Sequence, residues 1–314
     1  MKFNPDLFKS AYDFDDDITG MFKSGIYGFS SNGTYQPDPH VGFSLRNVKS
    51  PYLNILERYK RETYRDIEIK KYKSRAYFYG GSVMFGYCSV SDIKTIPGYI
   101  SILNKDVQIT NFALPATTIV QNFSHYVNKV INTFNTFREN HYVSCLIGYN
   151  EFILSYRRNL KYGVPAISIH ESVWGPAKIG QVLFRLPSYK MRLNEVAKEE
   201  FELNRLVGQV VNSIEVFRKV VEDFGGNFSV FLQPCLSGRE KILCGRELDL
   251  VPDNEFTSNY LKFIEAINTH FENQNIIYDL TQLFLSKKFQ IYIDQVHLGS
   301  KGNKLVAEKI LEVF

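Results

Sequence analysis

Two widely separated stretches hold the residue types that activate a serine as a nucleophile. Ser82 follows two glycines at the end of an aromatic, strand-like run, and Asp294 precedes His297 by three positions, ahead of a terminal helix. A serine hydroxyl attacks an acyl group only when a base removes its proton, and a carboxylate orients that base. Open α/β sheets place such sites at the carboxyl ends of their strands. Ser82, Asp294 and His297 therefore form a candidate catalytic triad.

Taken one at a time, these residues have ordinary structural explanations. Gly-Gly-Ser triplets are common in turns, and a histidine near a helix start can be a surface or capping residue. The Gly-x-Ser-x-Gly elbow of α/β hydrolases is also missing, because Met84 stands where that motif has its second glycine. The triad hypothesis therefore requires a fold that brings the two stretches together.

The pattern from residue 74 onward predicts such a fold. Short runs rich in Val, Ile, Phe or Tyr alternate with helix-length segments, which is typical of a parallel, doubly wound sheet with helices on both faces. The predicted strands are 75–79, 107–110, 142–147, 228–233 and 276–279, and the predicted helices include 119–139, 193–224, 254–273 and 303–313. We expect Ser300 to cap the last helix. The fold class is therefore α/β, a flavodoxin-like α/β/α sandwich with a five-stranded parallel sheet.

The chain divides into an irregular extension, residues 1–73, and a catalytic domain, residues 74–314. The extension is expected to hold a helix over 8–22 with an acidic face, followed by loops or a small hairpin. Lys and Arg are frequent in 57–75, which indicates an exposed basic face. Within the domain, 162–189 fits neither strand nor helix and predicts a loop or lid that includes His170 and Trp174.

Composition places the protein among ordinary globular chains. The chain has 314 residues, 44% hydrophobic and 22% charged, and a net charge of +4, which is too mild to indicate nucleic-acid binding. The four cysteines show no metal-ligand spacing and are expected to be buried free thiols. The sequence shows neither a signal peptide nor a run of membrane-spanning length, so a cytoplasmic location is expected.

Four blocks of the sequence, in order, resemble the SGNH (GDSL-like) serine hydrolases. They are Gly80-Gly81-Ser82, 107–113, Gly148-Tyr149-Asn150-Glu151, and Asp294 with His297. The resemblance implies that Ser82 is the nucleophile, with Asp294 and His297 as its partners. It also implies an oxyanion hole formed by the N–H of Ser82, the N–H of Ala113 and the side-chain amide of Asn150, with no cofactor and no metal.

The sequence departs from the family pattern in two places. Ala113 stands where a glycine is usual, which keeps the backbone donor but narrows the space for the acyl group. Glu151 replaces an aspartate beside the oxyanion donor Asn150. The other histidines (His40, His125, His141, His170 and His270) lack partners of this kind and are expected to be structural.

The predicted function is a serine esterase that removes acetyl or another short acyl group, on a carbohydrate or polysaccharide precursor, through an acyl-enzyme on Ser82. The carbohydrate rests on a faint resemblance of 35–43 to leaders of bacterial proteins linked to surface polysaccharides. Alternatives are an O-acyltransferase with the same triad, a catalytically idle glycan-binding protein, and a lipase or thioesterase for longer chains. Acyl length, alcohol and oligomeric state remain open.

Overall fold

The computed structural model describes residues 5–23, 35–38, 42–57, 60–63, 72–131, 141–156, 201–236 and 241–314. The predicted lid over 162–189, with His170 and Trp174, lies outside these ranges, as does His40. Within the described ranges, no helix is both long and apolar enough to cross a membrane.

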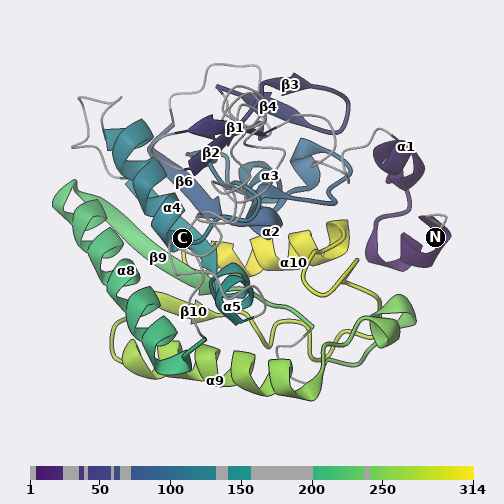
Figure 1. The fold of residues 1–314 in the computed structure, drawn as a ribbon. Coiled ribbons are helices and arrows are strands. Elements are labelled where there is room, and N and C mark those ends of the chain that lie inside the picture. Colours follow the sequence, from purple (N-terminus) through teal and green to yellow (C-terminus); the bar gives the residue numbers. More distant parts are fainter. Residues whose placement is uncertain are drawn as a thin grey trace, which may run out of the picture.

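Five parallel strands form the centre of the molecule (Figure 1). They are β6 (Ser74–Gly80), β7 (Val107–Asn111), β8 (His141–Ile147), β9 (Gly226–Leu232) and β10 (Ile277–Asp279). Their spatial order is β7-β6-β8-β9-β10, with β6 parallel to both of its neighbours. Numbered along the chain, this is the 2-1-3-4-5 order of flavodoxin-like folds, whose sites lie where the order reverses. The predicted fold class and all five strands are confirmed.

The extension adds three short strands to the same sheet, which the sequence did not predict. They are β3 (Val48–Lys49), β4 (Asn54–Leu56) and β5 (Lys60–Arg61), and β5 pairs antiparallel with β7. The sheet therefore has eight strands, from β3 at the top of Figure 1 to β10 near the bottom. A separate hairpin joins β1 (Tyr35–Asp38) to β2 (Gly42–Leu45).

Helices cover both faces of the parallel sheet. One face carries α4 (Ile119–His125), its π-helical continuation (Tyr126–Ile131), α5 (Tyr149–Tyr156), α8 (Leu203–Asp223) and α9 (Asn254–His270). The other carries α3 (Ile96–Leu103) and α10 (Ser300–Leu311), which pack on each other. Successive residues of β6 show the division, since neighbours on a strand point to opposite faces. Tyr79 contacts the ring of Phe217 on α8, whereas Phe78 stacks on Phe314 beyond α10.

Two local predictions near the chain ends are wrong. The helix expected over 8–22 is split into a 3-10 helix, η1 (Pro5–Ala11), and α1 (Ile18–Lys23). Aspartate side chains compete with the helix for its N–H groups: Asp16 accepts from the N–H of Asp13, and Asp17 caps α1 through the N–H of Gly20. Ser300 is the first residue of α10 and does not cap it, because Gly299 occupies that position.

The cysteine prediction is confirmed for three of the four residues. Cys88, Cys145 and Cys235 are buried free thiols, and Cys244 is a free thiol that is half-buried. Burial raises the pKa of the Cys88 and Cys145 thiols well above the ordinary value, so both stay protonated.

Candidate active site

The nucleophile lies at the sharp turn between β6 and the short helix α2 (Ser82–Phe85). Gly80 has φ +152°, which an L side chain rarely adopts. At Gly81 a Cβ atom would lie 2.1 Å from Nδ2 of Asn150, so only glycine allows that amide so close to the nucleophile. The glycine pair therefore both turns the chain and makes room for a polar side chain beside Ser82.

Ser82, His297 and Asp294 form a continuous hydrogen-bonded chain. Nε2 of His297 lies 2.7 Å from Oγ of Ser82, and Nδ1 of the same ring lies 2.6 Å from Oδ2 of Asp294. These contacts join residues 215 positions apart in the sequence. The arrangement has the geometry of a nucleophile, a base and a group that orients the base.

Asp294 is held as an ionised carboxylate. Its second oxygen, Oδ1, accepts hydrogen bonds from the N–H groups of Val296 at 2.9 Å and His297 at 2.8 Å. Partial burial disfavours the charged form, but the His297 ring and these N–H donors favour it more strongly and lower the pKa of Asp294 to about 2. The carboxylate can therefore fix the tautomer of His297 and stabilise the imidazolium that forms when Ser82 loses its proton.

A tight loop presents both Asp294 and His297. The N–H of Ile293 donates to the carbonyl of His297 at 2.8 Å, and the N–H of Gly299 donates to that of Ile291 at 2.9 Å. The buried Glu247 holds the start of this loop, because Oε1 accepts the N–H groups of Ile291 and Tyr292.

Lys241 neutralises this buried glutamate, with Nζ 2.6 Å from Oε2 of Glu247. Both side chains are almost completely buried, so neither charge contacts bulk water. This contribution of Glu247 and Lys241 to the Asp294–His297 loop could not be predicted from sequence, because neither residue lies near a recognisable motif.

Two of the three predicted oxyanion donors, the side-chain amide of Asn150 and the N–H of Ser82 itself, lie at the turn formed by Gly81 and Ser82. One N–H of the Asn150 amide donates to the carbonyl of Thr117 at 2.8 Å, which fixes the side chain and leaves its second N–H for a substrate. Ser82 is the first residue of α2, so its own N–H has no partner within the helix. Both donors lie at the carboxyl ends of neighbouring strands, as the fold class predicts.

The third predicted donor, the N–H of Ala113, already has an acceptor inside the protein. It donates to Oδ1 of Asn111 at 3.1 Å, and Ala113 is completely buried. Further along the same loop, Leu114 donates to the carbonyl of Gly80, Thr117 donates to that of Leu114, and Pro115 has no N–H. Ala116 remains, with φ +60° and partial exposure, and no acceptor for its N–H lies among residues 72–131 or the other described parts of the chain.

Glu151 joins the segment that follows β7 to the turn that follows β8. It is buried, and its two carboxylate oxygens accept the N–H of Ile119 at 2.8 Å and the N–H of Gly148 at 2.7 Å. Burial raises the pKa of Glu151, and these backbone donors oppose the shift. The glutamate that departs from the family pattern thus joins the start of α4 to the turn that carries Asn150.

The ring of Tyr87 lies against the imidazole of His297. The two ring centres are 4.7 Å apart, and the N–H of Tyr87 donates to the carbonyl of Ser82. Burial first, and then the nearby Cys88 and Asp294, raise the pKa of the Tyr87 hydroxyl, which therefore stays neutral. An aromatic ring in this position can stabilise the positive charge that the imidazole carries after it has taken the proton of Ser82.

We expect Tyr87→Leu to lower kcat roughly 3- to 30-fold, the range that corresponds to losing one cation–π contact. Leucine keeps most of the apolar volume but has no π electrons. Tyr87→Phe is the matched control, because it keeps the ring and should retain wild-type kcat. Equal kcat for the leucine and phenylalanine variants would show that the ring does not assist His297.

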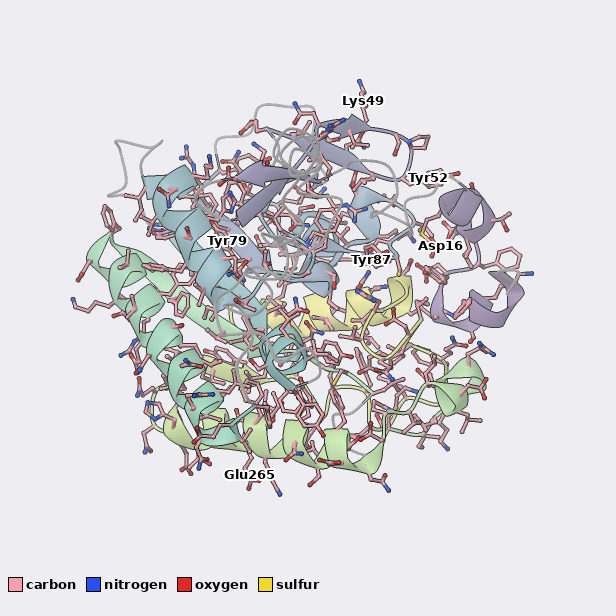
Figure 2. The ribbon with its side chains drawn as sticks, viewed as in Figure 1. Asp16, Lys49, Tyr52, Tyr79, Tyr87 and Glu265 are labelled. Carbon is pink, nitrogen blue, oxygen red and sulfur yellow. The ribbon has the colours of Figure 1, made fainter. Side chains whose placement is uncertain are left out.

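A lysine lies among the acidic residues near the amino terminus and offsets part of their charge. Nζ of Lys94 lies 2.8 Å from Asp13 and 3.6 Å from Asp16, with Asp15 at 4.0 Å. The ammonium group therefore occupies the position that a bound cation would need. Figure 2 places Asp16 on the same side of the molecule as Tyr52 and Tyr87.

Three of the other histidines lie within the described residues. His125 and His141 are buried, and Nε2 of His141 lies 3.0 Å from the hydroxyl of Tyr126. Burial lowers the pKa of His125 to about 3, so its ring is neutral. His270 ends α9 and packs on Phe271.

No family model matches this sequence, and no curated protein matches it significantly. Among solved structures, the acetyl xylan esterase AlAXEase is similar with a TM-score of 0.46 and 12% identity, over 76% of this chain and 98% of that one. A lipolytic protein of the G-D-S-L family from Veillonella parvula has a TM-score of 0.46 and 14% identity, over 77% and 98%. A catalytic mutant of an acetylxylan esterase from Geobacillus stearothermophilus has a TM-score of 0.45 and 13% identity, over 76% and 93%. At this distance, the chemistry must be argued from the site itself.

Proposed function

We propose that the protein is a serine esterase that forms an acyl-enzyme on Ser82. The observation that carries this proposal is the unbroken chain from Oγ of Ser82 through His297 to the Asp294 carboxylate, at 2.7 and 2.6 Å. A catalytically idle binding protein has no need to hold Ser82 in hydrogen-bonding register with the His297–Asp294 pair, which belongs to a loop 215 positions away. The activated hydroxyl, the base and the open donors together serve acyl transfer.

The reaction starts with attack of the Ser82 oxygen on the ester carbonyl carbon. Nε2 of His297 takes the hydroxyl proton, and the carbonyl π electrons move to oxygen, giving a tetrahedral oxyanion. The intermediate collapses when the bond to the alcohol oxygen breaks, and His297 gives its proton to that alcohol. Water then repeats the attack with His297 as base, which releases the acid and restores Ser82.

The oxyanion needs donors that are already in place. The side-chain amide of Asn150 and the N–H of Ser82 supply two of them in this proposal. For the third, the engaged N–H of Ala113 argues against the donor expected from sequence, and we assign the open N–H of Ala116 instead. Ala116 precedes Thr117, and the carbonyl of Thr117 accepts a hydrogen bond from the Asn150 amide. This bond holds the Ala116 and Asn150 donors close to each other.

We expect Asn150→Ala to lower kcat by roughly 10²- to 10³-fold, the usual cost of losing one oxyanion donor. The amide is expected to bind the substrate oxygen most strongly once that oxygen carries negative charge, so the loss in kcat should exceed any change in KM. The matched control is Asn227→Ala, which removes an exposed amide near the amino end of β9. A fall of less than about threefold in kcat for Asn150→Ala would remove this residue from the oxyanion hole.

The finer part of the proposal is the substrate: an acetyl or other short acyl ester, on a carbohydrate. Its support is the resemblance of 35–43 to leaders of polysaccharide-linked proteins. Initial rates with p-nitrophenyl acetate, butyrate and octanoate test acyl length, and release of acetate from an acetylated xylo-oligosaccharide tests the alcohol. A preference for octanoate would contradict the short acyl group. Transfer of acetyl to an added sugar, in place of release to water, would favour the transferase.

A further inference from the structure

Arg61 is a buried arginine that belongs to the extension and touches the nucleophile helix. Its side chain is 1% exposed, although it lies in the basic run 57–75 for which the sequence predicted an exposed face. That prediction is wrong for Arg61. A buried guanidinium must be paired and hydrogen-bonded to be tolerated, so its partners indicate what it is there to hold.

Two of the partners are carbonyls at the end of α2. Nη1 of Arg61 donates to the carbonyl of Phe85 at 3.0 Å and to that of Gly86 at 2.6 Å. The guanidinium also lies over the ring of Phe85, 5.1 Å from its centre. The last carbonyls of a helix have no partner within it and carry partial negative charge, so a cation there stabilises the helix.

The other partners fix the guanidinium itself. Nε donates to Oδ1 of Asp92 at 2.7 Å, and Nη2 donates to the carbonyl of Tyr52 at 3.0 Å. Asp92 in turn accepts both the backbone N–H and the side-chain amide of Asn54 on β4. The charge is therefore neutralised and held between the extension and the segment that follows α2.

The helix that Arg61 caps is only one turn long and begins with the nucleophile. Ser82 and Phe85 are its first and last residues, so a shift of the capped end moves the hydroxyl. Nδ2 of Asn111 also donates to the carbonyls of Met84 and Phe85, in each case at the longer distance of 3.4 Å. The position after the helix requires glycine, because Gly86 has a left-handed backbone with φ +86° and a Cβ there would lie 2.3 Å from Cγ2 of Thr95.

We propose that Arg61 is a positioning residue for Ser82, so that the extension is a working part of the catalytic unit. The inference rests on the proposed esterase function. Arg61 does not touch substrate; it fixes α2 so that Oγ of Ser82 stays in line with His297. Misplacement of a reacting atom by about 1 Å can cost on the order of 100-fold in rate.

The test compares full-length variants by kcat and KM for p-nitrophenyl acetate, by the rate of Ser82 labelling with a fluorophosphonate, and by thermal unfolding. Arg61→Lys keeps the charge but loses the planar fork that reaches both carbonyls. Arg61→Met/Asp92→Asn removes both charges together, so that no buried carboxylate is left unpaired. Thr63→Val is the matched control: it breaks the bond from Oγ1 of Thr63 to the carbonyl of Ile109, close to Arg61 in the chain, without touching α2.

We expect both Arg61 variants to lower kcat and the labelling rate by about 10- to 100-fold with KM nearly unchanged. Thr63→Val should keep wild-type kcat even where its unfolding temperature falls. Wild-type kcat in the Arg61 variants, or an equal loss in Thr63→Val, would overturn the inference while leaving the esterase proposal intact. Absence of both turnover and labelling in wild type would overturn both together.

Discussion

Replacement of Ser82 by alanine is expected to abolish ester hydrolysis, lowering kcat by at least about 10⁴-fold. Without the hydroxyl no acyl-enzyme can form, and His297 loses the group from which it takes a proton. The fold should persist, because the change removes one hydrogen bond, the 2.7 Å contact to Nε2 of His297, and leaves the backbone turn intact. Hydrolysis of p-nitrophenyl acetate and the thermal unfolding temperature measure the two effects separately.

Ser101→Ala is the matched control for this prediction. Ser101 lies on α3, is buried, and donates to the carbonyl of Gly98 in its own helix. Ser101→Ala makes the same chemical change as Ser82→Ala, the loss of one serine hydroxyl, but at a position outside the triad. Its kcat should stay at the wild-type value. Substantial turnover by a folded Ser82→Ala variant would show that another group performs the chemistry.

Asp294→Asn is expected to lower kcat by about 10⁴-fold, the scale found when a triad carboxylate becomes an amide. Oδ1 of Asp294 accepts two backbone N–H groups, so the amide oxygen of asparagine will keep that position. Its NH₂ group then faces Nδ1 of His297, which must become the acceptor. The ring proton moves to Nε2, and the base can no longer take a proton from Ser82.

The pH dependence of stability offers a second readout for Asp294. The folded-state pKa, about 2, lies below the ordinary value of 3.8, so the ionised carboxylate stabilises the fold above about pH 4. That contribution is lost as the pH falls from about 4 towards 2. The difference in unfolding temperature between wild type and Asp294→Asn should therefore shrink over this range.

Asp279→Asn is the control for the loss of kcat expected in Asp294→Asn. Oδ1 of Asp279 accepts the N–H and the hydroxyl of Thr281, beyond β10 and outside the triad. It should leave kcat unchanged. Wild-type turnover in Asp294→Asn, with Asp279→Asn also active, would contradict the role given to Asp294.

The parallel sheet, and the pairing of Asp294 with His297, could be predicted from sequence because both depend on local signals. Each parallel strand is an apolar run, bounded by segments of another period, and Asp294 and His297 lie three residues apart in one loop. The added strands β3 and β5 are two residues long, too short to show any periodicity. One arginine within a basic run, such as Arg61, carries no signal in the sequence that tells whether its side chain is exposed or buried.

The proposed oxyanion donor after β7 could not be chosen correctly from sequence for a different reason. Sequence resemblance pointed to Ala113, but which N–H remains open depends on the side chain of Asn111 and on the left-handed backbone of Ala116. Those are properties of the folded loop. A glycine would have indicated a left-handed backbone at this position, whereas an alanine at φ +60° gives no such signal in the sequence. The support from Glu247 and Lys241 was missed for a similar reason, since it joins segments about 45 residues apart.

Covalent labelling is the most direct test of whether His297 activates Ser82 as a nucleophile. Wild-type protein treated with a fluorophosphonate should gain the mass of one adduct, and peptide mapping should place that adduct on Ser82. Asp294→Asn should react far more slowly at neutral pH. No adduct on the folded wild type, or an adduct on another residue, would show that Ser82 is not the activated nucleophile.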